Sequence, residues 1–281
     1  MSNRALILQG VEEVFKESLG NTISKEEAIR PELAGIDIFE MPLVGFASAK
    51  DALFEKYKEV GVVGPWFREP VEWLAGAKTV VSFFFPFTEE VKDSNRKMKD
   101  GPSSLWLHGR IEGQRFLNAY MKRLQEWLLE KGVNGVVPAI NPNFKAITAG
   151  NNLQEYAIVN ETTFSSNWSE RHAAYAAGLG TFGLSKGLIT EKGIAGRFAS
   201  IIIDAEVVPD ERKYTGIYDY CTMCGACVRR CPGQAITLEE GKNHNKCNTT
   251  VNTLSAPHAP RYGCGLCQTK VPCESRIPKK V

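Results

Sequence analysis

Residues 221–232 read CTMCGACVRRCP, and this spacing, C-x2-C-x2-C-x3-C-P, holds iron-sulfur clusters in bacterial-type ferredoxins. Three thiolates at intervals of three residues can wrap one face of a 4Fe-4S cluster from a single loop. The fourth, Cys231, begins a helix-forming stretch and is expected to point toward a second cluster. A zinc site typically pairs two C-x2-C knuckles around one tetrahedral ion, which fits this spacing poorly. The sequence therefore predicts iron-sulfur binding and, with it, electron transfer.

The other four cysteines follow at irregular spacing. In two-cluster ferredoxins each motif lends its outer cysteine to the other cluster. The ligand sets predicted by this rule are Cys221, Cys224, Cys227 and Cys273 for cluster 1, and Cys231, Cys247, Cys264 and Cys267 for cluster 2. Two alternatives stay open at this point, namely zinc knuckles and a single cluster with spare thiols.

The position of the cysteines also divides the chain. The first 220 of the 281 residues contain none of the eight cysteines, and 43% of all residues are hydrophobic, which is ordinary for a globular protein. We expect a mixed α and β domain over residues 1–215 that binds cofactor and substrate, and a ferredoxin-like domain over residues 216–281. The second domain has few large apolar residues, so cluster binding should supply much of its folding free energy.

Charge and hydropathy narrow the choice of partners and location. The formal net charge is +2, which gives no general argument for nucleic acid or for an acidic membrane surface. No stretch approaches 18 consecutive apolar residues and the N-terminus lacks a secretory pattern, so we expect a cytoplasmic protein without membrane contact. Reducing compartments favour metal-binding cysteines over disulfides.

Apolar periodicity predicts the main elements of the first domain. Helices are expected over residues 3–19, from Ser24 up to Pro31, over 51–60 and over 111–131. Runs of β-branched and aromatic residues predict strands over 79–85 and 198–208, the first in the centre of a sheet. Residues 173–187 begin like a helix and then carry four glycines, which indicates tight turns or a close backbone approach.

Outside the cysteines, several motifs resemble the superfamily of epoxyqueuosine reductases and reductive dehalogenases, which are cobalamin-dependent iron-sulfur enzymes. The resemblance covers about residues 75 to 275. The motifs are Glu170-Arg171, Gly178-Leu179-Gly180 with Gly183, Leu188-Ile189-Thr190, the strand from Ser200 to Val208, and Tyr262-Gly263-Cys264-Gly265-Leu266-Cys267-Gln268.

This resemblance implies a fold and a cofactor. The fold would be α+β, with a nitroreductase-like α/β sandwich followed by a two-cluster module similar to bacterial ferredoxins. Cobalamin would bind without its lower axial base, next to the nearer cluster. The implied cofactor-binding residues are Gly178, Leu179, Gly180, Gly183 and Arg197. A simple turn between helix and strand is the alternative explanation of the glycines.

The chain also departs from the family pattern. The position of the acid proposed for epoxyqueuosine reductases is Phe164, their Asp-Tyr-His signature is replaced by 111–113 (IEG), and no helical-repeat tail follows Val281. Action on tRNA is therefore in doubt, and we do not expect a nucleic-acid partner. Candidates for the missing proton donor are Tyr156, Tyr175 and Glu170.

Three functions follow from these observations. The first is a reductase that takes electrons from a low-potential donor, such as ferredoxin or flavodoxin, and passes them through two clusters to a corrinoid and a small-molecule substrate. The second is an electron carrier or maturation protein without a corrinoid. The third is an epoxyqueuosine reductase acting on tRNA.

Overall fold

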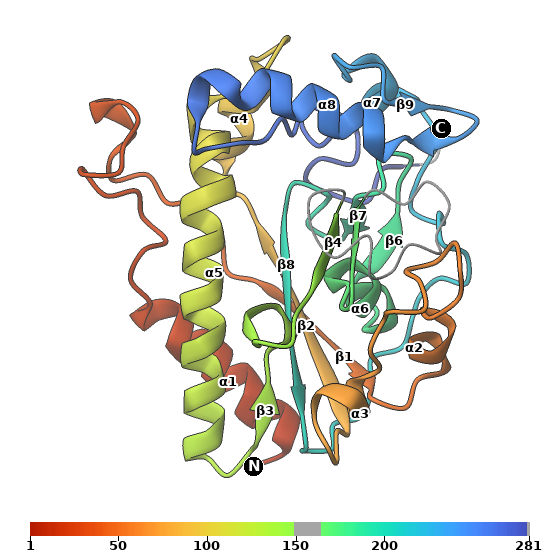
Figure 1. The fold of residues 1–281 in the computed structure, drawn as a ribbon. Helices are drawn as coiled ribbons and strands as arrows, with labels where there is room; N and C mark the ends of the chain where they lie inside the picture. Colours follow the sequence, from red (N-terminus) through yellow and green to blue (C-terminus); the bar gives the residue numbers. More distant parts are fainter. Residues whose placement is uncertain (149–163, 280–281) are drawn as a thin grey trace.

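A four-stranded antiparallel sheet forms the centre of the computed structural model, which describes residues 1–148 and 164–279 (Figure 1). The strand order is β1-β2-β8-β3. Their bounds are Leu43–Ser48 (β1), Thr79–Pro86 (β2), Gly196–Ile203 (β8) and Gly135–Val136 (β3). Both predicted strands are confirmed, and β2 lies inside the sheet as expected. The second one, β8, begins slightly earlier than predicted and ends at Ile203 instead of 208.

Alternate residues of β2 are buried on opposite faces of the sheet. Every residue of β2 is buried. Val81, Phe83 and Phe85 join the core under the long helices, whereas Val80 and Phe84 pack on the other side. A strand covered on both faces reads as a continuous apolar run, because neither set of side chains meets water.

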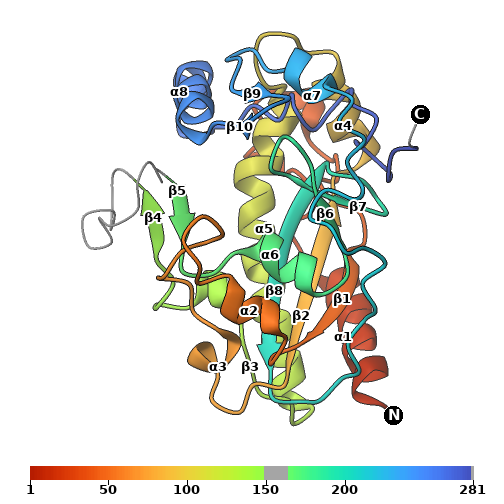
Figure 2. The same ribbon diagram turned by 90° about the vertical axis from the view of Figure 1, so that its right-hand side faces the viewer.

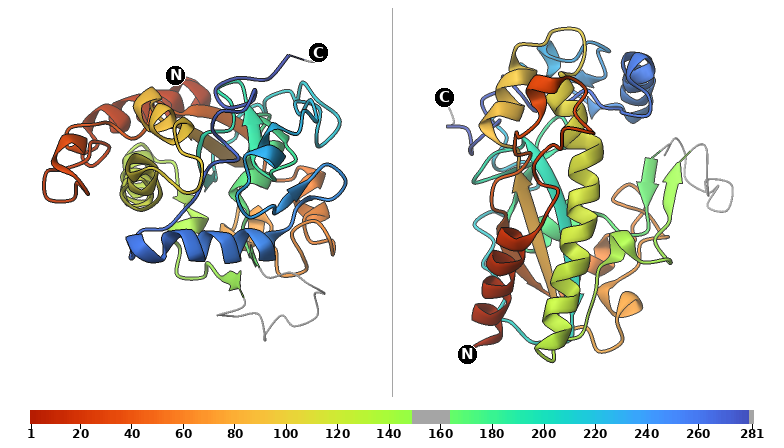
Figure 3. Two further views of the ribbon diagram at one scale, coloured as in Figure 1. Left: turned by 90° about the horizontal axis from the view of Figure 1, so that it is seen from above. Right: turned by 90° about the vertical axis from the view of Figure 1, so that its left-hand side faces the viewer.

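Helices cover both faces, so the body has three layers (Figures 1 and 3). α1 (Asn3–Glu17) and α5 (Ser104–Glu130) pack together on one face. α6 (Glu170–Ala176) packs on the other, against β1, β2 and β8, and α2 (Ala52–Lys56) lies beside it. The predicted mixture of helix and sheet is confirmed.

Two helix predictions need correction. α5 begins at Ser104, well before Ile111, because the Ser103 hydroxyl caps it by accepting a hydrogen bond from Trp106 N at 3.1 Å. The stretch after Ser24 is a turn, not a helix; Ser24 Oγ accepts from Glu27 N at 3.3 Å, but Pro31 starts a short 3-10 helix a few residues later.

The remaining elements are short. They are η1 (Pro31–Leu33), α3 (Pro70–Trp73), α4 (Glu89–Arg96), η2 (Pro138–Ile140), the hairpin of β4 (Ala146–Thr148) with β5 (Phe164–Ser166), the hairpin of β6 (Gly180–Phe182) with β7 (Leu188–Thr190), α7 (Ala226–Arg229), β9 (Ile236–Thr237), β10 (Gly241–Lys242), α8 (His244–Ser255) and η3 (Ala256–His258). No helix in the described ranges is both long and apolar enough to cross a membrane.

The cysteine-bearing part of the chain gathers at one end of the sheet (Figures 1 and 2). α7, β9 and α8 lie there together with α4 and the first turns of α5. Few of its apolar residues are buried, among them Ala235, Ile236, Leu266 and Val271. A module with so small a core depends on its ligands and on docking to the sheet domain for stability. The division at residues 215 and 216 stays a prediction.

Candidate iron-sulfur and substrate site

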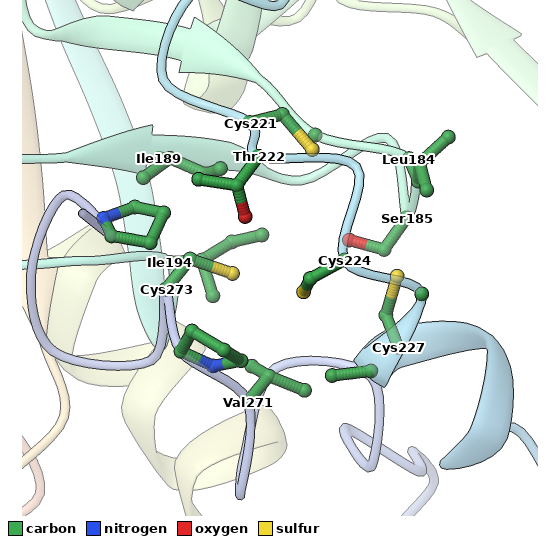
Figure 4. Close-up of a pocket in the computed structure, with 15 residues that line it drawn as sticks. Leu184, Ser185, Ile189, Ile194, Cys221, Thr222, Cys224, Cys227, Val271 and Cys273 are labelled. Carbon is green, nitrogen blue, oxygen red and sulfur yellow. The ribbon is translucent and has the colours of Figure 1, made fainter. Parts of the chain in front are cut away.

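Four cysteines from two distant segments line one pocket (Figure 4). Cys221, Cys224 and Cys227 come from the loop that leads into α7, and Cys273 comes from the C-terminal loop. The backbone oxygen of Cys273 accepts a hydrogen bond from Ile194 N at 2.9 Å, which fixes that loop against the sheet domain. These are the four residues predicted to bind cluster 1.

The thiols of this group interact electrostatically. Burial and, after it, the charges of Cys221, Cys227 and Cys224 together raise the pKa of Cys273 to about 12. Without metal the Cys273 thiol stays protonated near neutral pH. Iron must therefore displace its proton, and binding is expected to weaken as the pH falls.

The other four cysteines form a second group beside the first. Burial raises the pKa of Cys264 to about 11, and the neighbouring Cys267, Cys247 and Cys231 contribute in the same direction. Cys231 Sγ also accepts a hydrogen bond from Ala235 N at 3.2 Å. The structure thus brings together each predicted set of four cysteines, one from α8 included, although their spacing is irregular in the sequence.

Among the described residues no three or more Cys, His, Asp or Glu side chains converge on a point as the ligands of one metal ion would. In a 4Fe-4S cluster each thiolate binds a different iron atom, so the four cysteine sulfurs surround the whole cluster and do not converge on a single ion. Ligation of a cluster by either group stays a proposal.

A buried ion pair fixes the loop after Cys273. Arg96 of α4 bonds Glu274 through Nε at 2.7 Å and Nη2 at 2.6 Å, and the Glu274 side chain is 7% exposed. The second carboxylate oxygen accepts from Lys270 N at 2.6 Å. Both Arg96 nitrogens contact the same oxygen of Glu274, and hydrogen bonds between charged groups of this kind are strong.

A second ion pair fixes the segment before Cys264. Arg261 Nη2 lies 2.8 Å from Oε1 of Glu112 on α5, whose side chain is 3% exposed. Glu112 also bonds His108 Nδ1 at 3.0 Å. Although burial raises the pKa of Glu112, the hydrogen bonds from His108 and Arg261 lower it to about 2. Neither ion pair was expected from the sequence; the available signals were Glu274, directly after Cys273, and Arg261, three residues before Cys264.

Local steric contacts and backbone conformation explain why residues 178–183 contain several glycines. A Cβ on Gly180 would overlap the carbonyl oxygen of Ile189 across the β6–β7 hairpin. Gly178 has φ of +79°, which only glycine adopts easily. A Cβ on Gly183 would lie 3.8 Å from Cys221 Sγ, so this hairpin borders the first cysteine group. The alternative of a turn between helix and strand gains support, and contact of these glycines with a corrinoid stays a prediction.

Glu170 is a buried carboxyl at the start of α6. Neither of its oxygens has a hydrogen-bond partner within bonding distance among the described residues, and it forms no ion pair there with Arg171. Burial raises the pKa of Glu170 to about 7, while the nearby Ser200 and Trp168 side chains lower it in part. A carboxyl with this pKa exchanges its proton near neutral pH, which suits a general acid.

Replacing Glu170 by Gln should therefore change stability in a pH-dependent way. The folded pKa of about 7 exceeds the usual value of 4.5, so the wild type loses stability as pH rises between these values. We expect Glu170→Gln to be more stable than the wild type by about 3 kcal/mol at pH 8, and equally stable near pH 4.5. Urea unfolding of anaerobic protein at both pH values measures this. Glu130→Gln, an exposed substitution, is the control, and an equal difference at both pH values would contradict the assignment.

The two tyrosine candidates differ in what the structure describes. Tyr175 is 7% exposed and packs between Phe182 and Tyr214, with ring centroids 6.2 and 5.0 Å away. Burial raises its pKa, which makes it a weaker acid. Tyr156 lies outside the described residues. Of Phe164, the structure describes only that its backbone begins β5.

Arg197 lies on β8 and is half-buried. Its Nη2 donates to the Gln114 side-chain oxygen, and its Nε is buried without a hydrogen-bond partner among the described residues. Gln268 Oε1, next to Cys267, is buried and unpartnered in the same sense. Arg197 Nε and Gln268 Oε1 are thus buried polar atoms without partners, and they make the region beside the second cysteine group polar.

Comparison with known proteins gives a local match in sequence. A family model for 4Fe-4S binding domains matches residues 214–237. Tetrachloroethene reductive dehalogenases of Desulfitobacterium hafniense and Dehalobacter restrictus are 40% identical to this chain over 68 residues. That match covers 24% of this chain and 12% of the dehalogenases, so it spans a small part of their length.

Comparison of structures extends over the whole fold. An epoxyqueuosine reductase from Streptococcus thermophilus matches with a TM-score of 0.53 and 18% identity, over 100% of this chain and 69% of that one. A catabolic reductive dehalogenase in complex with 3-bromo-4-hydroxybenzoic acid matches with a TM-score of 0.50 and 15% identity, over 98% and 37%. An epoxyqueuosine reductase in complex with a modified tRNA-Tyr stem loop matches with a TM-score of 0.51 and 18% identity, over 95% of this chain and 66% of that one.

At these identities the structural likeness concerns the fold, and the match of the 4Fe-4S family model concerns residues 214–237. The two kinds of match agree with each other and with the motifs in the sequence. They confirm the resemblance of this chain to the superfamily that contains the epoxyqueuosine reductases and the reductive dehalogenases.

Proposed function

We propose that this chain is an iron-sulfur oxidoreductase that passes electrons through two 4Fe-4S clusters to a small-molecule substrate. The observation that carries the proposal is the gathering of all eight cysteines into two adjoining groups of four. Cys227 and Cys267 belong to different groups. Burial is the main cause of the raised pKa of Cys227, and the charge of Cys267 raises it as well, so the two groups lie close together. Two clusters held by these adjoining groups would form a short path for electrons.

The surroundings of the two groups suggest a direction for the electrons. Cys224 is exposed, so electrons from ferredoxin, flavodoxin or a similar donor would enter through cluster 1. Cys267 lies near Arg171 of α6, so electrons would leave through cluster 2 toward the sheet domain. Tyr262 and Gln268 border the same region.

A corrinoid is the proposed electron acceptor on that side, and the residues present fit one. The rim of a corrin carries amide groups, which both donate and accept hydrogen bonds. The buried, unpartnered Gln268 Oε1 would accept a hydrogen bond from such a group. When bound, the corrinoid would supply a cobalt centre for two-electron reduction of the substrate. Glu170, with its raised pKa, is the described residue best suited to supply a proton.

Metal analysis of anaerobically purified protein tests the proposal. We expect about eight irons and about eight acid-labile sulfides per chain. Zinc in place of iron would refute the proposal. Cobalt content after growth with a corrinoid separates the reductase from the rival reading, an electron carrier or maturation protein with clusters and no cobalt.

An epoxyqueuosine reductase acting on tRNA is the second candidate, and the likeness to a structure with a tRNA stem loop favours it. We nevertheless expect no restoration of queuosine in cells that lack their own reductase. Phe164 cannot donate a proton, and loss of a positioned acid typically costs about 100- to 10,000-fold in rate. Mass spectrometry of tRNA nucleosides from the complemented strain is the test. A clear queuosine peak would reverse this expectation.

A further inference from the structure

Three arginines from three elements of the sheet domain lie together beside the second cysteine group. They are Arg110 of α5, Arg171 of α6 and Arg197 of β8. The Arg110 guanidinium stacks over the Tyr262 ring at 4.8 Å. A Cβ on Gly263 would lie 2.8 Å from Arg110 Cγ, so the glycine makes room for this arginine. The fold thus places Arg110 against the loop that carries Cys264 and Cys267.

None of the three arginines has an acidic partner within the described part of the chain. No carboxylate there lies within ion-pair distance of any of them, in contrast to Arg96 and Arg261. Their one hydrogen bond to a described side chain runs from Arg197 Nη2 to Gln114. Arg197 Nε is buried and donates to nothing described. A buried donor without an acceptor is costly, and a charged one more so.

The charges of these side chains act on one another. Burial and, after it, the charges of Arg110 and Arg171 lower the pKa of Arg197 to about 9. The thiolate of Cys267 offsets part of this effect at Arg171. Arg197 has no such thiolate among its interaction partners, only the Tyr262 phenol. Among the described residues, Arg197 therefore has neither a thiolate nor a carboxylate beside it to balance its charge.

We propose that Arg110, Arg171 and Arg197 together bind an oxyanion, a carboxylate or a phosphate, carried by a ligand of the reductase site. The planar forks of arginine match the paired oxygens of these groups and give two-point hydrogen bonds. The oxyanion accepts from Arg197 Nε and neutralises charges that the protein leaves unpaired. The identity of the ligand as a substrate or corrinoid rests on the proposed function; the oxyanion site itself does not.

Calorimetric titration of anaerobic, cluster-loaded protein with inorganic phosphate and with 4-hydroxybenzoate, at constant ionic strength, tests the site. We expect saturable binding of at least one probe by the wild type. Arg197→Gln should raise Kd at least about tenfold, because a charged hydrogen bond and a charge are lost. Arg197→Lys should recover only part of the affinity, since lysine lacks the fork. Arg123→Gln, on the exposed side of α5, is the matched control and should bind like the wild type.

Two corrinoids distinguish the sources of the oxyanion. Cobalamin carries a phosphodiester in its nucleotide tail, and cobinamide lacks it. If Arg197→Gln weakens cobalamin binding and spares cobinamide, the oxyanion belongs to the corrinoid. If it weakens only 4-hydroxybenzoate or phosphate, the oxyanion belongs to the substrate. Either result supports the oxyanion site.

Other results overturn it. Absence of saturable binding of every probe by the wild type, or equal affinities of Arg197→Gln and the wild type, would refute the site. Iron and sulfide content of the same samples keeps this outcome separate from failure of the proposed function. Protein with full cluster content and no oxyanion binding contradicts the inference alone, whereas protein without iron contradicts the function.

Discussion

Cys273→Ser is expected to lower the iron content from about eight to about four per chain and to remove one of two cluster signals. Cys273 shares its pocket with Cys221, Cys224 and Cys227, far from it in sequence (Figure 4). Serine is a poor ligand for iron in these clusters, so the cluster that depends on Cys273 should be lost or altered. Iron analysis and electron paramagnetic resonance of the dithionite-reduced variant measure both effects.

Cys247→Ser provides the matched comparison, because Cys247 lies on α8 with the other group. It should cause a similar loss of iron but remove the other signal. Double substitution should leave almost none. If Cys273→Ser and Cys247→Ser change the same signal, the proposed exchange of outer ligands is wrong. If neither lowers iron, neither cysteine is a required ligand, and both proposed ligand sets are wrong.

Gly265→Val is expected to abolish the cluster held by Cys264 and Cys267, the two residues that flank this sequence position closely. Gly265 has φ of +68°, and a Cβ there would overlap the indole ring of Trp106 on α5. The left-handed conformation costs a branched residue about 1–2 kcal/mol, and overpacking adds about 1–3 kcal/mol. Together these costs should push the Cys264–Cys267 loop off α5.

The control for this prediction separates backbone strain from overlap. Gly35 has φ of +85°, but a Cβ there meets nothing within 4 Å. Gly35→Val should therefore cost only the strain and keep full iron content. Iron analysis, the cluster signals and the thermal unfolding midpoint of both variants decide the matter. Loss of both signals in Gly265→Val would mean that the two groups form one folding unit, and an unchanged spectrum would contradict the close packing on Trp106.

The grouping of Cys221, Cys224 and Cys227 was predictable because ferredoxin spacing is a local property of the sequence. These three cysteines come from one loop, so their grouping needs no knowledge of the rest of the fold. The ion pair of Arg96 with Glu274 joins residues 178 positions apart and has no local pattern. The same holds for the three arginines, which three different elements contribute. Contacts of this kind depend on how the layers pack, which the sequence does not display.

The beginning of α5 was mispredicted for a physical reason. Gly109 and Gly113 lie inside the helix, where glycine is normally unfavourable. A Cβ on Gly109 would crowd the Phe87 ring, and one on Gly113 would crowd Phe39, so both glycines allow the helix to approach the aromatic core. Gly109 and Gly113 therefore serve tertiary packing, and they interrupt the apolar pattern from which the start of the helix was predicted. The strand at 79–85 was clear because its entire length is buried.

The paired anchors of the last cysteines have a consequence for the maturation of the protein. Both proposed ligand sets need cysteines between residues 264 and 273, and this segment is held by Glu112 of α5 and Arg96 of α4. Those helices have to be folded before the anchors can form. Cluster insertion is accordingly expected after these helices of the sheet domain have folded. The two ion pairs would then hold the cysteine-bearing segment in place and keep the oxygen-sensitive clusters from being released.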